Sequence, residues 1–178
     1  MLKGLMTKIF TFLFLFLAVL SPLNALEITA LEKEKDGEIT ASFCDIFQIK
    51  NIALNQSALA AAVTLPKDEE IYENLAILNS DIAGKIISCF AVCELNTTCK
   101  NAKYEIESIK KIKDNLISAK VVFDGDISAI FLVSSYIKKN KKLYRVKTPQ
   151  DFKFLNKKYQ NNFRTWLLNE IKNKYEMF

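Results

Sequence analysis

Four cysteines are the residues of this chain with the clearest capacity for chemistry. Cys44, Cys89, Cys93 and Cys99 all lie in the first 100 residues, and an even number in an exported protein suits two disulfides. Three pairings are possible, and the sequence alone does not choose among them. Cys89 and Cys93 would share a helix face, but side chains at that spacing rarely have the geometry of a disulfide. We therefore favour Cys93 with Cys99 and Cys44 with Cys89.

The residue types that most other chemistries need are missing. The chain has no histidine, which removes the commonest general base and the usual Ser or Cys triads. Paired C-x2-C spacing is also absent, which disfavours a metal site or a thioredoxin-like redox site. The acidic run Asp68-Glu69-Glu70, beside Pro66, is typical of a solvated turn. We predict no catalytic residue, metal or cofactor, and an envelope enzyme that uses carboxylates and lysines stays the alternative.

A concentrated basic segment is the main candidate for binding. Such clusters attract phosphate-rich polymers, lipid headgroups and acidic proteins. The structural alternative is a soluble hairpin tip whose lysines prevent edge pairing. The candidate residues for binding an anion or a partner are Lys138, Lys139, Lys141, Lys142, Arg145 and Lys147.

One asparagine lies in an acceptor motif for glycosylation. Asn96 is followed by Thr97-Thr98 and is preceded, two residues earlier, by Glu94. An N-x-Thr motif alone is frequent by chance, but the acidic residue matches the extended acceptor of some bacterial oligosaccharide transferases. We therefore predict that Asn96 is a glycosylation site, on condition that such a transferase is present.

The N-terminal 25 residues have the three parts of a secretory signal. Lys3 and Lys8 precede an apolar run over residues 9–20, and a short tail ends at the small residue Ala25. As a helix, this run would cover roughly 18 Å, less than the roughly 30 Å of a bilayer core. We expect cleavage after Ala25 and a periplasmic protein that begins at Leu26.

Two segments of the chain share a sequence pattern at a constant offset of 78 residues. Residues 26–41 and 104–119 match at seven identical positions, including Lys33 with Lys111 and Ile39 with Ile117. Self-similarity of this kind indicates repeated structural units. The halves differ in charge: residues 26–102 have 6 basic and 12 acidic residues, whereas residues 103–178 have 17 and 8. The opposite charges suit docking of one half against the other or a separate anionic ligand.

Turn and capping residues predict strands followed by one helix in each repeat. Asp36-Gly37 is typical of a hairpin, Pro66 ends an apolar strand, and Asn79 begins a helix. In the first repeat we expect strands over 28–34, 39–49 and 59–65, then a helix with Ile82, Ile86, Cys89, Phe90 and Cys93 on one face. In the second we expect strands over 104–112 and 116–123, a hairpin turning at 138–142, a strand over 143–146, and a helix with Tyr159, Phe163, Trp166 and Leu167 on the matching face.

These features resemble the stage V sporulation protein G (SpoVG) family. The resemblance rests on Ile28-Thr29-Ala30, Asp36-Gly37, residues 59–66, Ile77-Leu78-Asn79-Ser80 and Lys85-Ile86. The second half keeps Thr148-Pro149 and Leu155-Asn156 but has Lys157 where the first has Ser80. The resemblance implies an α+β fold in which each repeat is a small antiparallel sheet with one packed C-terminal helix. Family members form homodimers, so a tandem copy implies a pseudo-dimer in one chain.

The predicted organisation is a signal over 1–25, an acidic repeat over 26–93, a linker over 94–103 and a basic repeat over 104–178. We expect an exported, non-enzymatic binding protein of the cell envelope. Its partner would be an envelope protein or an anionic envelope polymer, with a membrane surface as a further possibility. The family includes nucleic-acid-binding regulators, but an exported protein does not meet the chromosome, so a nucleic-acid-binding regulator stays an alternative that requires the signal not to function. No functional residue is transferred from the family.

Overall fold

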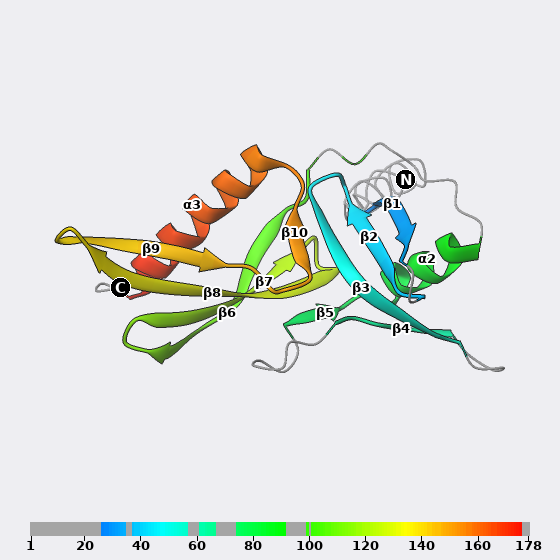
Figure 1. The fold of residues 1–178 in the computed structure, drawn as a ribbon, viewed down its shortest axis with the longest axis horizontal. Coiled ribbons are helices and arrows are strands. Elements are labelled where there is room, and N and C mark those ends of the chain that lie inside the picture. Colours follow the sequence, from blue (N-terminus) through cyan, green and yellow to red (C-terminus); the bar gives the residue numbers. More distant parts are fainter. Residues whose placement is uncertain are drawn as a thin grey trace, which may run out of the picture.

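The computed structural model describes residues 26–34, 37–56, 61–66, 74–91, 99 and 101–175. These residues form an α+β fold in which two five-stranded sheets carry two helices (Figure 1). In chain order the elements are β1 (Ile28–Lys33), β2 (Ile39–Phe43), β3 (Phe47–Gln56), β4 (Ala61–Thr64), β5 (Leu75–Ile77), α2 (Ser80–Ala91), β6 (Tyr104–Lys113), β7 (Leu116–Phe123), β8 (Ile127–Lys138), β9 (Lys141–Lys147), β10 (Phe152–Phe154) and α3 (Lys157–Lys174).

The two sheets exchange one short strand each. The first sheet has the order β1-β2-β3-β10, with β4 also pairing with β3. The second has the order β5-β8-β7-β6, with β9 also pairing with β8. Thus β5, from the first half of the chain, extends the sheet of the second half, and β10 does the reverse. All of these pairings are antiparallel.

The exchanged strands make matching contacts. Ile77 of β5 pairs with Ile127, and Phe154 of β10 pairs with Phe47. The residue after each strand then donates its backbone N–H to the turn of the other half: Leu78 to the carbonyl of Asp126 at 2.7 Å, and Leu155 to the carbonyl of Ile46 at 2.8 Å. The halves are therefore tied together by backbone hydrogen bonds as well as by side chains.

A tight turn divides the strand that was expected over residues 39–49. Cys44 and Asp45 have φ of 51° and 53°, a left-handed conformation that a strand cannot contain. Asp124 and Gly125 form the corresponding turn between β7 and β8, with φ of 50° and 79°. In both turns the third residue donates its N–H to the carbonyl of the last strand residue, Phe43 or Phe123, at 2.9 Å. The expectation of one continuous strand was wrong.

The hairpins β1–β2 and β6–β7 share their register only in part. Leu31 pairs with Ala41 and Ile109 with Ala119, which agrees with the offset of 78 residues. At the other end of each hairpin, next to the turns that follow β2 and β7, Ile28 pairs with Phe43, whereas Tyr104 pairs with Phe123. By this pairing Ile28 corresponds to Tyr104, not to Ile106. Strands β6 and β7 each have two extra residues there, and a constant offset does not describe them.

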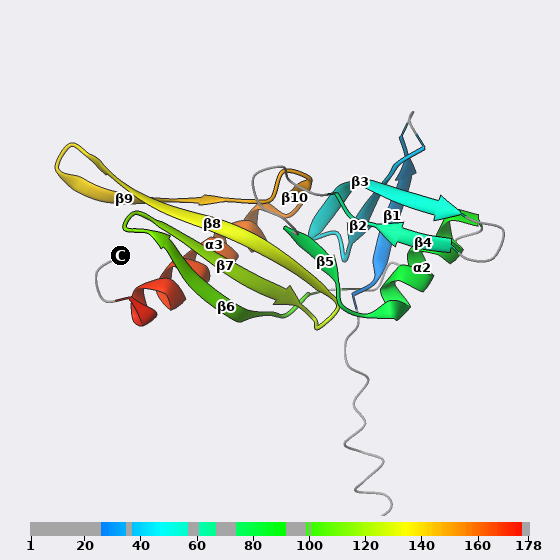
Figure 2. The same ribbon diagram turned by 90° about the horizontal axis from the view of Figure 1, so that it is seen from below.

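Each helix lies on one sheet, and the aromatic core joins the halves. Helix α2 packs against the first sheet through Ile82 and Ile86, both fully buried, and α3 covers a face of the second (Figures 1 and 2). Phe47 of the first half stacks on Phe152 and contacts Phe123, with ring centroids 4.8 Å and 5.0 Å apart. The buried residues of α3 are Phe163, Leu167 and Ile171.

Both helices and both predicted hairpins of the second half are confirmed within a few residues. Helix α2 begins at Ser80, directly after Asn79, and α3 begins after Asn156, whose side chain accepts the N–H of Tyr159. Cys93, which was expected on the first helix face, lies outside the described residues. Strands β5 and β10 were missed because three residues carry too short a pattern.

Candidate functional site

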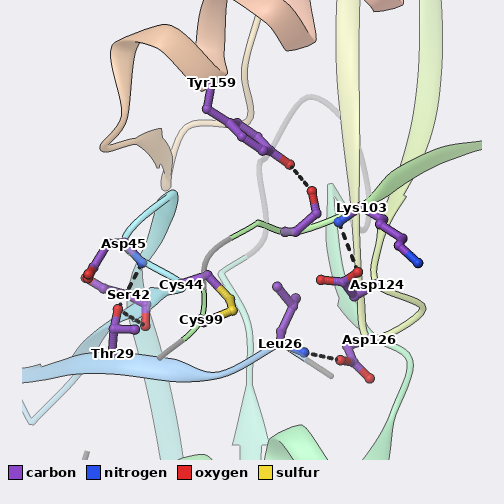
Figure 3. Close-up of a disulfide and its surroundings, with 11 residues drawn as sticks. Leu26, Thr29, Ser42, Cys44, Asp45, Cys99, Lys103, Asp124, Asp126 and Tyr159 are labelled. Atoms are coloured by element: carbon purple, nitrogen blue, oxygen red, sulfur yellow. Dashed lines mark hydrogen bonds between the residues drawn. A yellow bond between two sulfur atoms is a disulfide. The ribbon is translucent and has the colours of Figure 1, made fainter. Parts of the chain in front are cut away.

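The disulfide lies where the two halves meet. Cys44, in the turn after β2, is bonded to Cys99, 55 residues later, with the Cα atoms 4.8 Å apart (Figure 3). Both favoured pairings, Cys93 with Cys99 and Cys44 with Cys89, were therefore wrong. Cys44 stands in a turn beside the segment that leads into β6, so Cys99 reaches it. A disulfide with a buried cysteine, Cys44, indicates an oxidising environment.

A third cysteine also takes part in a disulfide. Cys89, on α2, is also disulfide-bonded, and Cys93 lies outside the described residues. Within the described part of the chain, no group of three or more His, Cys, Asp or Glu side chains could hold a metal ion.

A buried carboxylate accepts a hydrogen bond from the backbone of the first described residue. Asp126 is 3% exposed, and its Oδ2 accepts the N–H of Leu26 at 2.7 Å (Figure 3). Its Oδ1 accepts a hydrogen bond from Nδ2 of Asn79, the residue before α2, at 2.8 Å. Asp126 thus connects the turn after β7 to β1 and to the first helix, both of which belong to the other half.

A second carboxylate of the same turn has a different environment. Asp124 accepts the backbone N–H of Lys103 at 2.9 Å, while its Oδ2 is buried without a hydrogen-bond partner. Desolvation raises the pKa of Asp124 above its ordinary value, the hydrogen bond from Lys103 opposes the shift, and the charge of Asp126 adds to it.

A tyrosine of α3 forms a hydrogen bond to the segment that precedes β6, near these two carboxylates. The Tyr159 hydroxyl donates to the carbonyl of Ala102 at 2.9 Å (Figure 3). Burial raises its pKa, and the neighbouring Tyr104 and Asp124 add to the rise. A phenol that stays protonated is a hydrogen-bond donor rather than a base. The geometry suits connection of the halves, and it presents no paired nucleophile and base.

The predicted basic residues lie on an arm made by β8 and β9. Figures 1 and 2 show these strands extending past the tip of β6 and β7. Strand β7 supports β8 only as far as Ser134, opposite Leu116. We define the basic arm as residues 136–143, a two-stranded ribbon in which Tyr136 pairs with Leu143. It contains Lys138, Lys139, Lys141 and Lys142, all exposed.

The register of the arm gathers positive charge on one face. Lys138 lies directly opposite Lys141, and side chains directly opposite share a face of the sheet. Because a strand alternates its side chains, Arg145 and Lys147 continue the face of Lys141. Tyr144, on the other face, packs toward the core and lies under Lys172 of α3, 5.0 Å from the ring centroid. Lys138, Lys141, Arg145 and Lys147 therefore form a stripe directed away from α3, whereas Lys142 shares the face of Tyr144.

The tip adds exposed apolar surface to this charge. Ile137 is 78% exposed and Tyr136 47%, high values for side chains of this kind. The turn is made by Lys139 and Asn140, with φ of 50° and 57°, as in a two-residue hairpin turn with both central residues left-handed. The segment 127–150 has six basic and no acidic residues, so the arm carries no compensating acid of its own.

Asn96 lies outside the described residues, and its glycosylation stays a prediction. Among the described residues, no helix combines the length and the apolar composition that crossing a membrane requires. Comparison of the chain with protein-family models, with curated proteins and with solved structures finds no match.

The sequence analysis missed both carboxylates of the junction. One signal for them was available: Asp124-Gly125 follows a β-prone run, and Asp-Gly is typical of a turn. The burial of Asp126 had no local signal, because the groups around it come from residues 26 and 79.

Proposed function

We propose that this chain is an exported, non-enzymatic binding protein of the bacterial cell envelope, periplasmic after removal of its N-terminal segment. In this proposal the basic arm binds an anionic component of the envelope. The observation that carries the proposal is the projecting ribbon, in which four lysines surround the exposed Ile137.

The energetics of the arm favour an anionic partner. Like charges directly opposite each other destabilise a strand pair, and Lys138 and Lys141 are opposite at the end of the ribbon. An anionic surface would relieve this repulsion. Lysines near such a surface contribute about 1 kcal/mol each. Ile137 and Tyr136 add apolar surface that contact with a partner would remove from water.

We further propose that the chain is a tandem duplication arranged as a pseudo-dimer, as the SpoVG resemblance implies. The order of five strands and one helix occurs twice, and each half lends a short strand to the other. The hydrogen bonds from Leu78 and Leu155 correspond to each other in this exchange. Such reciprocity is typical of two copies related by a two-fold axis.

The surface between the halves gives no support to the enzyme alternative. That alternative requires acids that converge in a groove between the repeats. Among the described residues, the aromatic side chains of Phe47, Phe123 and Phe152 meet there, and Asp124 accepts the backbone N–H of Lys103. Asp126 is engaged by two hydrogen bonds. We assign no catalytic residue.

Binding to lipid vesicles tests the role of the basic arm. The processed chain should sediment with vesicles of phosphatidylglycerol at low salt and not with vesicles of phosphatidylcholine. Replacement of Lys138, Lys139, Lys141 and Lys142 by Ser should weaken this binding roughly 100- to 1,000-fold, from about 1 kcal/mol per lysine. Circular dichroism would check that the variant remains folded.

A matched variant separates the arm from overall charge. Lys85, Lys153, Lys157 and Lys158 are exposed and lie off the arm, so their replacement by Ser removes the same charge. This control should bind vesicles nearly as well as the unaltered chain. Equal binding by the arm variant at low salt would remove the arm from the proposed function and leave its lysines as protection against edge pairing.

A further inference from the structure

The burial of Asp126 is unusual because no cation accompanies it. A carboxylate that is only 3% exposed normally has a cationic partner. Lys111 with Asp114 and Lys120 with Glu107 form ion pairs elsewhere in the described part of the chain, whereas the donors to the side chain of Asp126 are the amide groups of Leu26 and Asn79. Two neutral donors leave its charge uncompensated.

The corresponding position in the turn after β2 carries an uncharged side chain. The turn after β2 has Ile46 where the turn after β7 has Asp126, and Ile46 is equally buried. Ala102 corresponds to Leu26, because the carbonyls of the residues that follow them, Lys103 and Glu27, accept matching hydrogen bonds from the two turns. Ala102 lies in the middle of the chain, where the peptide continues. The carboxylate occurs only where residue 26 is the neighbour.

We propose that the peptide bond between Ala25 and Leu26 is cut and that the new α-ammonium group of Leu26 is the missing cationic partner of Asp126. The cut adds one water molecule across the bond, which leaves a carboxylate on Ala25 and an ammonium on Leu26, and it requires a processing peptidase of the export machinery. This inference rests on the export that forms part of the proposed function.

The geometry is ready for such a terminus. The Leu26 nitrogen lies 2.7 Å from Asp126 Oδ2, a distance suited to a charge-assisted hydrogen bond. The Leu26 side chain is fully buried, which fixes the nitrogen in place. The contact joins the start of the first half to the turn of the second, close to the Cys44–Cys99 disulfide (Figure 3). Processing would thus replace a hydrogen bond from a neutral amide by a buried ion pair that joins the two halves.

The first test is the N-terminus of the exported protein. The full chain would be produced in a bacterium with an intact export pathway, recovered from the periplasm, and measured by intact mass and N-terminal peptide mass spectrometry. The proposal expects a chain that begins at Leu26. An uncut chain, or a terminus at any other residue, would overturn it.

The second test asks whether the ammonium group and Asp126 interact. One serine inserted between Ala25 and Leu26 moves the ammonium away and leaves the Leu26 nitrogen as an amide, and intact mass selects preparations that begin with that serine. Asp126→Asn should lower the unfolding midpoint of the unaltered processed chain by about 10 °C. In the chain with the inserted serine, the same substitution should lower it by less than half as much.

The neighbouring carboxylate provides the matched control. Asp124→Asn changes a group that accepts from Lys103 and makes no contact with Leu26, so its effect should be the same with and without the inserted serine. Equal losses from Asp126→Asn in both chains would overturn the ion pair even if processing occurs at Leu26. Failure of the basic arm to bind vesicles would leave both measurements unchanged, because the arm lies at the other end of the second sheet.

Discussion

The turns after β2 and β7 have the same backbone and different chemistry. Both have two residues in the left-handed conformation, and both accept the exchanged strand of the other half. The first turn carries Cys44 and Ile46, whereas the second carries Asp124 and Asp126 at the corresponding positions. One junction is thus closed by a covalent bond and an apolar side chain, and the other by carboxylates. The comparison indicates that backbone pairing sets the arrangement and that side chains decide how each junction is secured.

The hairpins at the outer edges of the two sheets differ in the same way. The described parts of β3 and β4 include a single basic residue, Lys50, whereas β8 and β9 together carry five. Both hairpins end the same order of strands. The same order of strands therefore supports a nearly uncharged edge in the first sheet and a strongly basic edge in the second, and the proposed binding surface lies on the second.

Removal of the covalent junction is expected to have the largest effect on stability. The Cys44–Cys99 bond closes a loop of 55 residues, and loop-closure entropy for that length gives about 4 kcal/mol. Replacement of both cysteines by Ser should lower the free energy of unfolding by about this amount in urea titrations. Each single substitution should cost nearly as much as the double, since both remove one crosslink. Unchanged stability in all three variants would mean that the carboxylate junction suffices.

Substitution of the two asparagines that precede the helices is expected to have an intermediate effect on stability, and the effect should differ between the two halves. Asn156 accepts the N–H of Tyr159, and Asn79 accepts that of Asp81 but also donates to buried Asp126. Loss of a helix cap costs about 1 kcal/mol, and loss of a hydrogen bond to a charged group adds about 1.5 kcal/mol or more. Asn79→Ala should therefore destabilise the protein by over twice as much as Asn156→Ala, measured by urea unfolding.

A conservative variant separates the two roles of Asn79. Serine is a good helix cap but is too short to replace the amide that reaches Asp126, so Asn79→Ser should lose only the second contribution. Equal losses from Asn79→Ala and Asn156→Ala would show that Asp126 gains nothing from this hydrogen bond.

Local signals in the sequence predicted much of the fold. Asp36-Gly37, Asn79 and Asn156 act within a few residues of themselves, and the hairpins and helices that they predict are present. The exchange of β5 and β10 could not be predicted in this way, since each strand is three residues long and its partner lies about 50 or more residues away. Pairing over that distance is decided by the whole core.

The candidate sites also differ in whether local sequence or distant contacts determine them. The lysines of the arm form a run in the sequence, so composition alone identified them as candidates, although their distribution over the two faces of the ribbon depends on register. The predicted disulfide pairing was wrong because no local signal indicated that Cys44 lies in a turn. Asp126 was missed because its burial is created by Leu26 and Asn79, residues of the other half.

The smallest expected effect is the pH dependence of stability that Asp124 contributes in the turn after β7. Because burial raises the pKa of Asp124 in the folded protein, the folded state holds this proton more tightly than the unfolded state. Its contribution to stability is complete below the unfolded pKa of about 3.9 and is lost as the pH rises through the folded pKa. Unfolding midpoints of the unaltered chain and of Asp124→Asn, measured between about pH 3 and pH 7, should therefore shift relative to each other. The unaltered chain should lose its relative advantage as the pH rises.

The first turn is the control, since it has Cys44 where the second has Asp124. A disulfide does not titrate, so the difference between the unaltered chain and Cys44→Ser should stay constant over the same pH range. The expected change for Asp124 is small, because this side chain is only half-buried and solvent screens its charge. A relative shift in the opposite direction would mean that the hydrogen bond from Lys103 outweighs desolvation. In that case the carboxylate would be held at the junction by its charge, as Cys44 is held by its covalent bond.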